Sequence, residues 1–319
     1  MMRKFRSGVF VGVLCLMLCG CVKSGYHAAP VANAVSQDGV PISYAVYGRG
    51  DVTVVFVHGW SCDSRYWYNQ VPYFSKKYRV ITIDLAGHGN SGFSRKVYTT
   101  EAFGQDVAVV LQQLDVKNAV LVGHSMGGEI ILYAAKISPE RVIGLVGVDT
   151  LEDLGMVYPD EVKNSIYEPI AADFVPKVQE FVRSMFPANA DKALVDTIAR
   201  DMSSAPQEVA LSSMREYFKV SAPELIKGLA VPLKSVNADL WPTNVEGNKK
   251  LVPSYEMALM KGHGHFIMLE DPGQFNALLE RMINSILAET RKRSETTKLS
   301  AGRWSQYYTT ILTYLSNIW

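Results

Sequence analysis

Six residues near the middle of the chain, 123–128 (Gly-His-Ser-Met-Gly-Gly), constrain its fold more than any others. The apolar run before them, residues 118–123, predicts a buried strand, and residues 127–135 predict a helix. On such a strand-to-helix turn a serine is held in a strained backbone conformation, and a Cβ on a flanking glycine would collide with the neighbouring strand or helix. We therefore expect Ser125 to project from the sheet edge as a nucleophile, with the Met126 amide free to bind an oxyanion. An ordinary turn of small residues is the alternative.

Strands and helices alternate on both sides of this turn. Asp38-Gly39 between two short β patterns predicts a hairpin. Continuous apolar runs predict strands covered on both faces, and the order of the elements predicts an α/β fold with a mostly parallel, doubly wound sheet. The expected strands cover residues 31–37, 40–47, 52–57, 79–84, 142–148, 232–237 and 254–260, and the expected helices include 101–114 and 271–289.

The alternation stops after residue 150 and resumes near residue 229. Residues 151–228 contain helical patterns broken by six prolines, which predicts a helical cap inserted into the sheet domain. The core is then expected over residues 31–150 and 229–289. Residues 290–319 are expected to be a C-terminal extension that starts as a linker. Its aromatic end, 304–319, fits an interfacial membrane segment, a helix packed on the domain, or an extension without a role.

The first twenty residues are typical of a targeting segment. Three basic residues precede an apolar stretch of ten, residues 9–18, which is short for a membrane span. The Leu-Cys-Gly-Cys sequence ending at Cys21 resembles the lipobox of bacterial lipoproteins. That resemblance implies a leader over 1–20, lipidation of Cys21 and a tether over 21–30. Val22, rather than Asp, after that cysteine favours the outer membrane of a cell envelope. A plain secretory signal or an uncleaved anchor is the alternative.

Composition excludes some classes of partner and chemistry. The net charge of +1 gives no reason to expect nucleic acid or another polyanion. Of four cysteines, only Cys62 would remain unmodified after the leader, so no internal disulfide is expected. No activating pattern surrounds Cys62, which we expect to be structural. No obligate protein partner is indicated.

Two further segments could complete a site around Ser125. His58-Gly59-Trp60 ends an expected strand, where His58 would support the loop. Gly262-His263-Gly264-His265-Phe266 follows the last strand and offers a general base that could reach the same sheet edge. An acid to orient that base could come from Asp239, just after the strand over 232–237, or from Asp149, which also ends a strand.

These segments together resemble the α/β-hydrolase family, in its capped esterase and haloperoxidase-like group, from about residue 40 to residue 287. The resemblance implies that His265, between Gly264 and Phe266, is the base and that His263 is a loop residue. It also implies that Trp60 supplies the second oxyanion amide and favours Asp239 over Asp149 as the acid, although the glycine often found before that acid is missing. Residues 84–92 (Asp-Leu-Ala-Gly-His-Gly-Asn-Ser-Gly) resemble a structural turn of the same family.

The expected activity is a cofactor-free and metal-free hydrolysis of a small-molecule ester by Ser125, His265 and Asp239 through an acyl-enzyme. A proline-type aminopeptidase, a lactonase, a C–C hydrolase and a cofactor-free peroxidase share such a triad and stay open. A non-catalytic lipoprotein that keeps the fold as a binding module is the alternative of another class. Several cap residues could line an acyl pocket, though we expect most of them to pack helix against helix. They are Met156, Tyr158, Phe174, Phe181, Met185, Phe186, Met202, Met214, Tyr217 and Phe218.

Overall fold

The computed structural model describes the backbone of residues 31–316 and the side chains of residues 31–296. The expected leader over residues 1–20, the lipidation at Cys21 and the tether over 21–30 lie outside the described residues. Among the helices of the described range, none combines the length and the apolar character that crossing a membrane requires.

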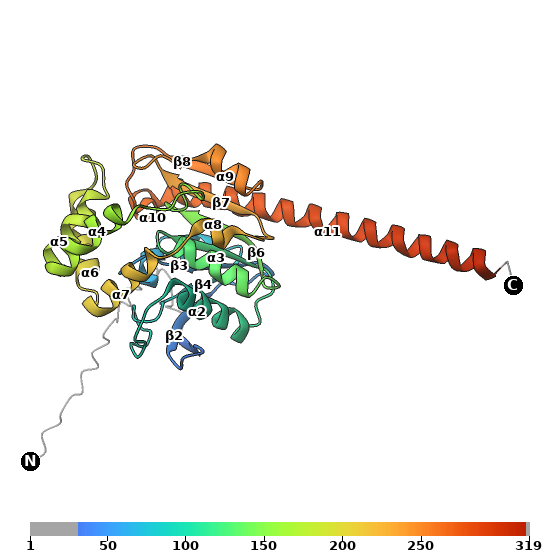
Figure 1. Cartoon of the computed structure of the whole chain (residues 1–319), viewed down its shortest axis with the longest axis horizontal. Coiled ribbons are helices and arrows are strands. Elements are labelled where there is room, and N and C mark those ends of the chain that lie inside the picture. The colour runs from blue at the N-terminus through green and yellow to red at the C-terminus, as the bar shows by residue number, and fades with distance from the viewer. Residues whose placement is uncertain (1–30, 317–319) are drawn as a thin grey trace, which may run out of the picture.

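A single sheet of eight strands forms the centre of the domain (Figure 1). Its strand order is β1-β2-β4-β3-β5-β6-β7-β8. Strands β1 and β2 pair antiparallel, as do β2 and β4, and all the other pairs are parallel. This confirms the predicted doubly wound fold. The strands are β1 (Ala32–Val35), β2 (Pro41–Tyr47), β3 (Thr53–Val57), β4 (Arg79–Ile83), β5 (Ala119–His124), β6 (Val142–Val148), β7 (Leu233–Ala238) and β8 (Glu256–Met260).

Helices cover both faces of this sheet. They are η1 (Ser64–Trp67), α1 (Val71–Phe74), α2 (Thr100–Gln113), α3 (Gly127–Ile137), α4 (Asp160–Ala172), α5 (Phe174–Ser184), α6 (Lys192–Ser203), α7 (Gln207–Tyr217), α8 (Ala222–Ile226), α9 (Val245–Leu251), α10 (Ile267–Glu270) and α11 (Pro272–Ser316). Helices α4 to α8 all lie between β6 and β7 in the chain, where the sequence predicts the inserted cap. In Figure 1 the cap helices α4 to α7 gather on the side opposite to the one where α11 leaves the domain.

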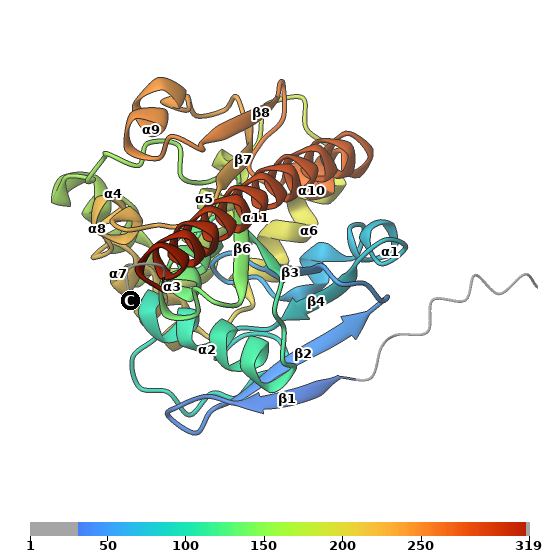
Figure 2. The ribbon, with the colours of Figure 1, turned by 90° about the vertical axis from the view of Figure 1, so that its right-hand side faces the viewer.

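Glycines in β5 and β6 show that α3 and α11 lie on opposite faces of the sheet. Gly123 and Gly147 are paired residues, and a Cβ on Gly123 would touch Ile131 of α3. Gly144 lies three residues before Gly147 and therefore faces the other way, where a Cβ would lie 2.3 Å from Ile286 of α11. Figure 2 shows α11 running across that second face, beside β6 and β7.

Helix α11 corrects the expectation of a linker from residue 290 onward, because the helix continues to Ser316. No proline follows Pro272, and Gly302 is the only glycine after Gly273, so the sequence offers no strong terminator. The Lys234 ammonium of β7, buried beneath the helix, pairs with Glu289 and Glu256. This contact fixes α11 at the point where the sequence suggested its end.

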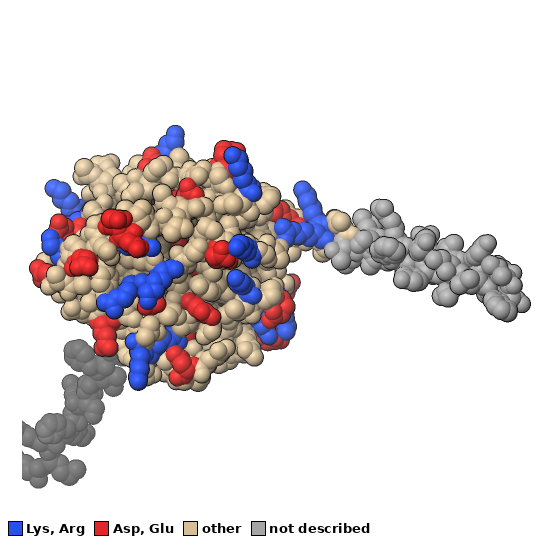
Figure 3. Space-filling view, in the orientation of Figure 1, with Lys and Arg blue, Asp and Glu red and all other residues tan. Residues whose placement is uncertain are grey.

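Charged side chains on one face of the domain are mixed in sign. On the face shown in Figure 3, Lys and Arg are interspersed with Asp and Glu, and no large patch of one sign covers this face. This distribution agrees with the near-zero net charge of the sequence.

The turn between β5 and α3 has the strained geometry that its sequence predicts. Ser125 has a φ of +53°, which a residue with a side chain rarely adopts. A Cβ on Gly123 would lie 2.2 Å from the carbonyl oxygen of Gly127, and one on Gly127 would lie 2.8 Å from that of Val57. Both clashes involve backbone atoms, so no side-chain rotation could relieve them.

We expect Gly123→Ala to lower the free energy of unfolding by about 3 kcal/mol or more, because the backbone must move to admit the methyl group. The matched control is Gly155→Ala, where the Cβ would meet nothing closer than 3.4 Å and the change should stay within about 0.5 kcal/mol. Urea denaturation of both variants measures the difference. Equal midpoints would refute the close approach.

Candidate active site

A cavity of about 670 Å³ lies between the carboxyl edge of the sheet and the cap. Ser125, His265, Trp60 and Met126, four residues that the sequence predicts for the site, all line it. The cap contributes a mostly apolar opposite wall. Its lining residues include Met156, Tyr158, Val162, Ile166, Phe181, Met185, Met202, Met214, Tyr217 and Phe218. The cavity is therefore a mostly apolar space with a few polar lining groups, as expected of a small-molecule site.

Ser125 is half-buried and accessible from this cavity. Its amide donates to the Val148 carbonyl over 3.1 Å, which ties the turn to the end of β6. A Cβ on Gly59 would lie 3.1 Å from the Ser125 Cβ, so the loop after β3 passes directly beside the nucleophile. Glycine at that position permits the approach.

His265 is held by backbone contacts from two sides. Its amide donates to the Met185 carbonyl of the cap over 2.9 Å, and its own carbonyl accepts from His124 Nε2 over 2.9 Å. The edge of the Trp241 ring packs on the imidazole, with the ring centroids 5.3 Å apart. No residue in the described range hydrogen-bonds to His265 Nε2, so this nitrogen is free to take a proton.

Asp149, and not Asp239, contacts the imidazole of His265. His265 Nδ1 lies 2.6 Å from Asp149 Oδ2, and the Ala238 amide donates to Asp149 Oδ1 over 2.7 Å. Asp149 follows β6, the strand next to the one that carries Ser125. Its φ of +44° is unusual for an aspartate and turns the chain sharply after the strand. The preference for Asp239 is therefore wrong, and the competing residue takes the position.

Asp239 lies one residue beyond β7, on the exposed side of the loop. Its carboxylate accepts from the Gly262 amide over 2.7 Å, so it supports the loop that carries the histidines without touching the imidazole. The 26 residues between Asp239 and His265 are enough for the chain to bring the two side chains into contact, but the longer separation between Asp149 and His265 also permits a contact. Sequence separation alone does not distinguish two carboxyls that end neighbouring strands.

Burial governs the ionisation of this pair. It lowers the pKa of His265 and raises the pKa of Asp149, because both charged forms lose their hydration in the cavity wall. The Ala238 amide opposes the rise at Asp149 by donating to the carboxylate. His265 is consequently neutral at neutral pH. With Nδ1–H directed at Asp149, its Nε2 lone pair faces the cavity as a base requires.

The two amides that are predicted to bind an oxyanion have no acceptor among the described residues. Within the described part of the chain, neither the Trp60 nor the Met126 amide donates a hydrogen bond to another residue. Met126 precedes the first turn of α3, where amides have no intrahelical acceptor. The Trp60 indole Nε1 donates to the Ala210 carbonyl of α7 over 2.7 Å. A single residue thus supplies a free amide to the cavity and a side-chain bond to the cap.

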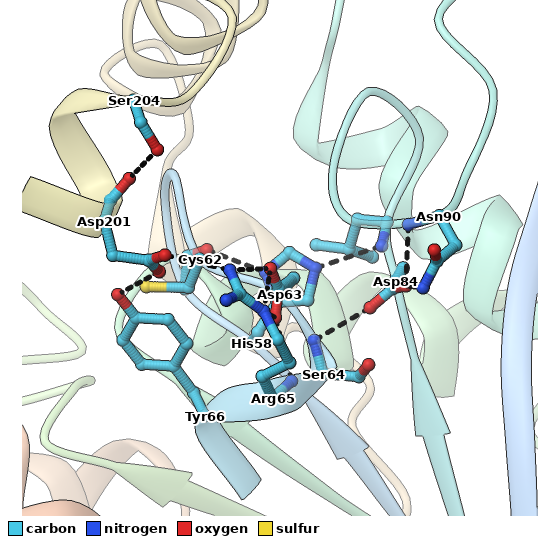
Figure 4. A network of polar contacts seen from close by, with 12 residues as sticks. His58, Cys62, Asp63, Ser64, Arg65, Tyr66, Asp84, Asn90, Asp201 and Ser204 are labelled. Atoms are coloured by element: carbon cyan, nitrogen blue, oxygen red, sulfur yellow. Dashed lines mark hydrogen bonds and ion pairs between the residues drawn. The ribbon is translucent and has the colours of Figure 1, made fainter. Parts of the chain in front are cut away.

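The loop that carries Trp60 is fixed to the core by polar contacts (Figure 4). His58 Nε2 accepts from the Leu85 amide over 3.0 Å, which gives His58 the supporting role expected of it. Asp84 accepts from the amides of Ser64 (2.8 Å) and Asn90 (2.9 Å). The turn over residues 84–92 is therefore structural, as its sequence predicts.

The same loop is also fixed to the cap. Asp201 of α6 accepts from the Tyr66 hydroxyl and from Arg65 Nη2 of η1, each over 2.9 Å (Figure 4). Asp63 pairs with the same guanidinium over 2.7 Å. Cys62 is buried beside them, and burial raises the pKa of its thiol, so a structural role fits this cysteine better than a nucleophilic one.

The cap residues differ in part from expectation. We expect most of the ten candidates to pack helix against helix, but eight of them line the cavity. Phe174 and Phe186 are buried in the core instead. The sequence analysis does not identify Glu152 or Trp241 as lining residues. Glu152 follows Asp149 by three residues and Trp241 follows Asp239 by two. Their closeness to the strand ends in the sequence is the feature that could have identified them as lining residues. In the described range, no group of three or more His, Cys, Asp and Glu residues is arranged to hold a metal.

Comparison with known proteins agrees with this geometry. The family model described as "alpha/beta hydrolase fold" matches residues 52–229, more than half of the chain. The chain belongs to the α/β-hydrolase fold family. The match begins one residue before β3 and includes the nucleophile turn, Asp149 and the cap.

Individual relatives and solved structures that are similar to this chain include a peroxidase and esterases. A non-heme chloroperoxidase of Streptomyces lividans is 37% identical over 124 residues, which cover 38% of this chain and 45% of that protein. An esterase from Rhodococcus sp. ECU1013 is 26% identical with a TM-score of 0.65, covering 80% of this chain and 99% of the other. A thermophilic esterase from Thermogutta terrifontis is 21% identical with a TM-score of 0.69, covering 81% and 99%.

We expect Asp149→Asn to lower kcat for an ester substrate by about 10³- to 10⁴-fold, because the amide no longer holds the tautomer and charge of His265. Asp239→Asn, which removes a carboxylate of the same size from the neighbouring strand end, should change kcat by less than about fivefold. Steady-state kinetics on both variants decide the assignment. A larger loss in the Asp239 variant would reverse it.

Proposed function

We propose that this chain is a serine carboxylester hydrolase that acts through Ser125, His265 and Asp149. The observation that carries the proposal is the 2.6 Å contact between His265 Nδ1 and Asp149 beside a cavity that Ser125 also lines. The family membership and the esterases among the relatives support the reaction class.

The chemistry follows from the free atoms of the site. His265 Nε2 takes the Ser125 proton as Oγ bonds to the ester carbonyl carbon, and the carbonyl oxygen becomes an anion near the Trp60 and Met126 amides. Each such donor contributes about 3 kcal/mol to the barrier reduction. The C–O bond to the alcohol then breaks, and the alcohol leaves with the proton from Nε2. Water, deprotonated by the same nitrogen, hydrolyses the acyl-enzyme and returns the proton to Ser125.

The size and lining of the cavity favour an acyl chain longer than acetate. About 670 Å³ of space lies beside Ser125, and methionine and aromatic side chains form much of its wall. Each buried methylene contributes about 0.8 kcal/mol, so two additional methylenes correspond to roughly tenfold in kcat/KM.

Hydrolysis of p-nitrophenyl acetate, butyrate and octanoate by the full chain in detergent tests the proposal. We expect kcat/KM to rise about tenfold from acetate to butyrate, and kcat to fall by at least about 10³-fold in Ser125→Ala and in His265→Ala. A fluorophosphonate probe should label the wild type at Ser125. Absence of both labelling and turnover in a folded protein would refute the proposal.

We further propose that the chain is a lipoprotein of the cell envelope, anchored through Cys21. The basic, apolar and cysteine-containing pattern of residues 1–21 supports this proposal. Two or more acyl chains on one residue give stable membrane binding, whereas a single chain binds marginally.

Metabolic labelling with radioactive palmitate in a bacterial host tests the anchor. We expect label in the membrane fraction for the wild type and none for Cys21→Ser, while Cys62→Ser retains the label. Label that persists in the Cys21 variant would contradict the anchor site.

A further inference from the structure

The cavity contains a carboxyl group that the hydrolytic mechanism does not use. Glu152 lies three residues after Asp149, is half-buried and lines the cavity. Within the described residues its carboxyl accepts no hydrogen bond from another residue and takes part in no ion pair, although its backbone carbonyl accepts from Asn244 and Asn248. The main chain at Glu152 is therefore fixed, while no other residue supplies a partner for its carboxyl.

A second carboxyl, that of Glu129, lies behind the lining residue Tyr217. Glu129 lies in the first turn of α3, four residues after Ser125, and is 9% exposed. Its Oε1 accepts from the Tyr217 hydroxyl over 3.3 Å, and Tyr217 lines the cavity. Its Oε2 is buried and has no hydrogen-bond partner. An unpartnered carboxylate oxygen in such a position is costly unless a ligand or a proton offsets it.

No described cation neutralises these two groups. Lys163 is the sole Lys or Arg among the lining residues, and its ammonium lies 3.2 Å from Asp160. Burial, with a smaller contribution from Asp149, raises the pKa of Glu152 to about 7. Burial and the nearby Glu152 raise the pKa of Glu129 to about 8. Near neutral pH both carboxyls are therefore protonated in a large fraction of molecules, and a bound cation would favour their ionised forms.

Aromatic rings line the cavity together with these carboxyls. Tyr158, Tyr217 and Trp241 all border it. Burial, with smaller contributions from Glu129 and Glu152, raises the pKa of both Tyr158 and Tyr217, which places the four side chains in one neighbourhood. Carboxylates combined with aromatic ring faces are the groups that recognise substituted ammonium ions.

We propose that Glu152, with Glu129 behind it and the aromatic rings beside it, binds an ammonium group of the substrate, so that the preferred esters are cationic. This inference rests on the proposed function and assigns its substrate class. Asp153, the other acidic lining residue apart from Asp149, is already satisfied by the Gly155 amide and the Asn244 side chain, each over 2.9 Å. It therefore serves as a matched control.

Two pairs of esters, each a cation and its neutral carbon isostere, test the proposal in the full chain. In the acyl pair, p-nitrophenyl trimethylammoniobutanoate is compared with p-nitrophenyl dimethylhexanoate. In the alcohol pair, butyrylcholine is compared with dimethylbutyl butanoate. In both neutral esters a terminal tert-butyl group replaces the trimethylammonium group. We expect kcat/KM to favour the cation at least about tenfold in one pair, and Glu152→Gln to reduce that ratio to near unity while the neutral ester changes less than about twofold.

The controls separate a contact from a general effect of charge. Glu129→Gln should reduce the ratio in part, and Asp153→Asn should leave it within about twofold. A neutral preference in both pairs, a ratio unchanged in Glu152→Gln, or an equal loss in Asp153→Asn would overturn the proposal.

Failure of the proposed esterase activity is distinguishable from failure of the cation site. If no ester is hydrolysed, calorimetry on Ser125→Ala compares the binding of choline with that of its neutral carbon isostere, dimethylbutanol. Tighter binding of choline that disappears with Glu152→Gln supports the site, and equal or weaker binding of choline refutes it.

Discussion

Ser125 adopts a left-handed backbone conformation because three stretches of main chain meet around it at distances that exclude a Cβ. Gly123 faces the carbonyl of Gly127, Gly127 faces that of Val57, and Gly59 lies against Ser125 itself. Strand β5 can therefore turn directly into α3 beside the end of β3. The Ser125 hydroxyl accessible from the cavity, the free Met126 amide and the neighbouring Trp60 amide all result from this contact, since a looser turn would separate them.

The rest of the site comes from elements that approach this turn from different directions. Strand β6 supplies Asp149, the loop after β8 supplies His265, and the cap holds His265 through the Met185 carbonyl. Each contribution is fixed by backbone hydrogen bonds more than by surface ion pairs, and backbone contacts hold a geometry with less loss of side-chain entropy. The polar groups of the site are consequently held in place, whereas the methionine side chains that line the cavity can adapt their shape.

The sequence predicts the sheet, the cap and most of the site because those features depend on local patterns. Periodicity gives the strands, and the spacing of small residues gives the turn at Ser125. The choice between Asp149 and Asp239 depends instead on which of two neighbouring strand ends lies nearer His265, a distance that no local pattern encodes. The same holds for Glu129 and Glu152, which lie 23 residues apart in the sequence and come near each other only in the folded chain. Helix α11 continues past residue 289 because no residue ends it, although the hydrophobic stripe that predicts it does end there.

Trp60 couples the position of the cap to the position of its own backbone amide, because it is attached to both. Its indole is bonded to α7, its amide donates to no other described residue, and Asp201 joins α6 to the same loop. A ligand too large for the cap to accommodate would displace this loop and with it the Trp60 amide. The enzyme would then discriminate between molecules by turnover as well as by affinity. Oversized molecules could thus bind in the cavity as inhibitors without being cleaved.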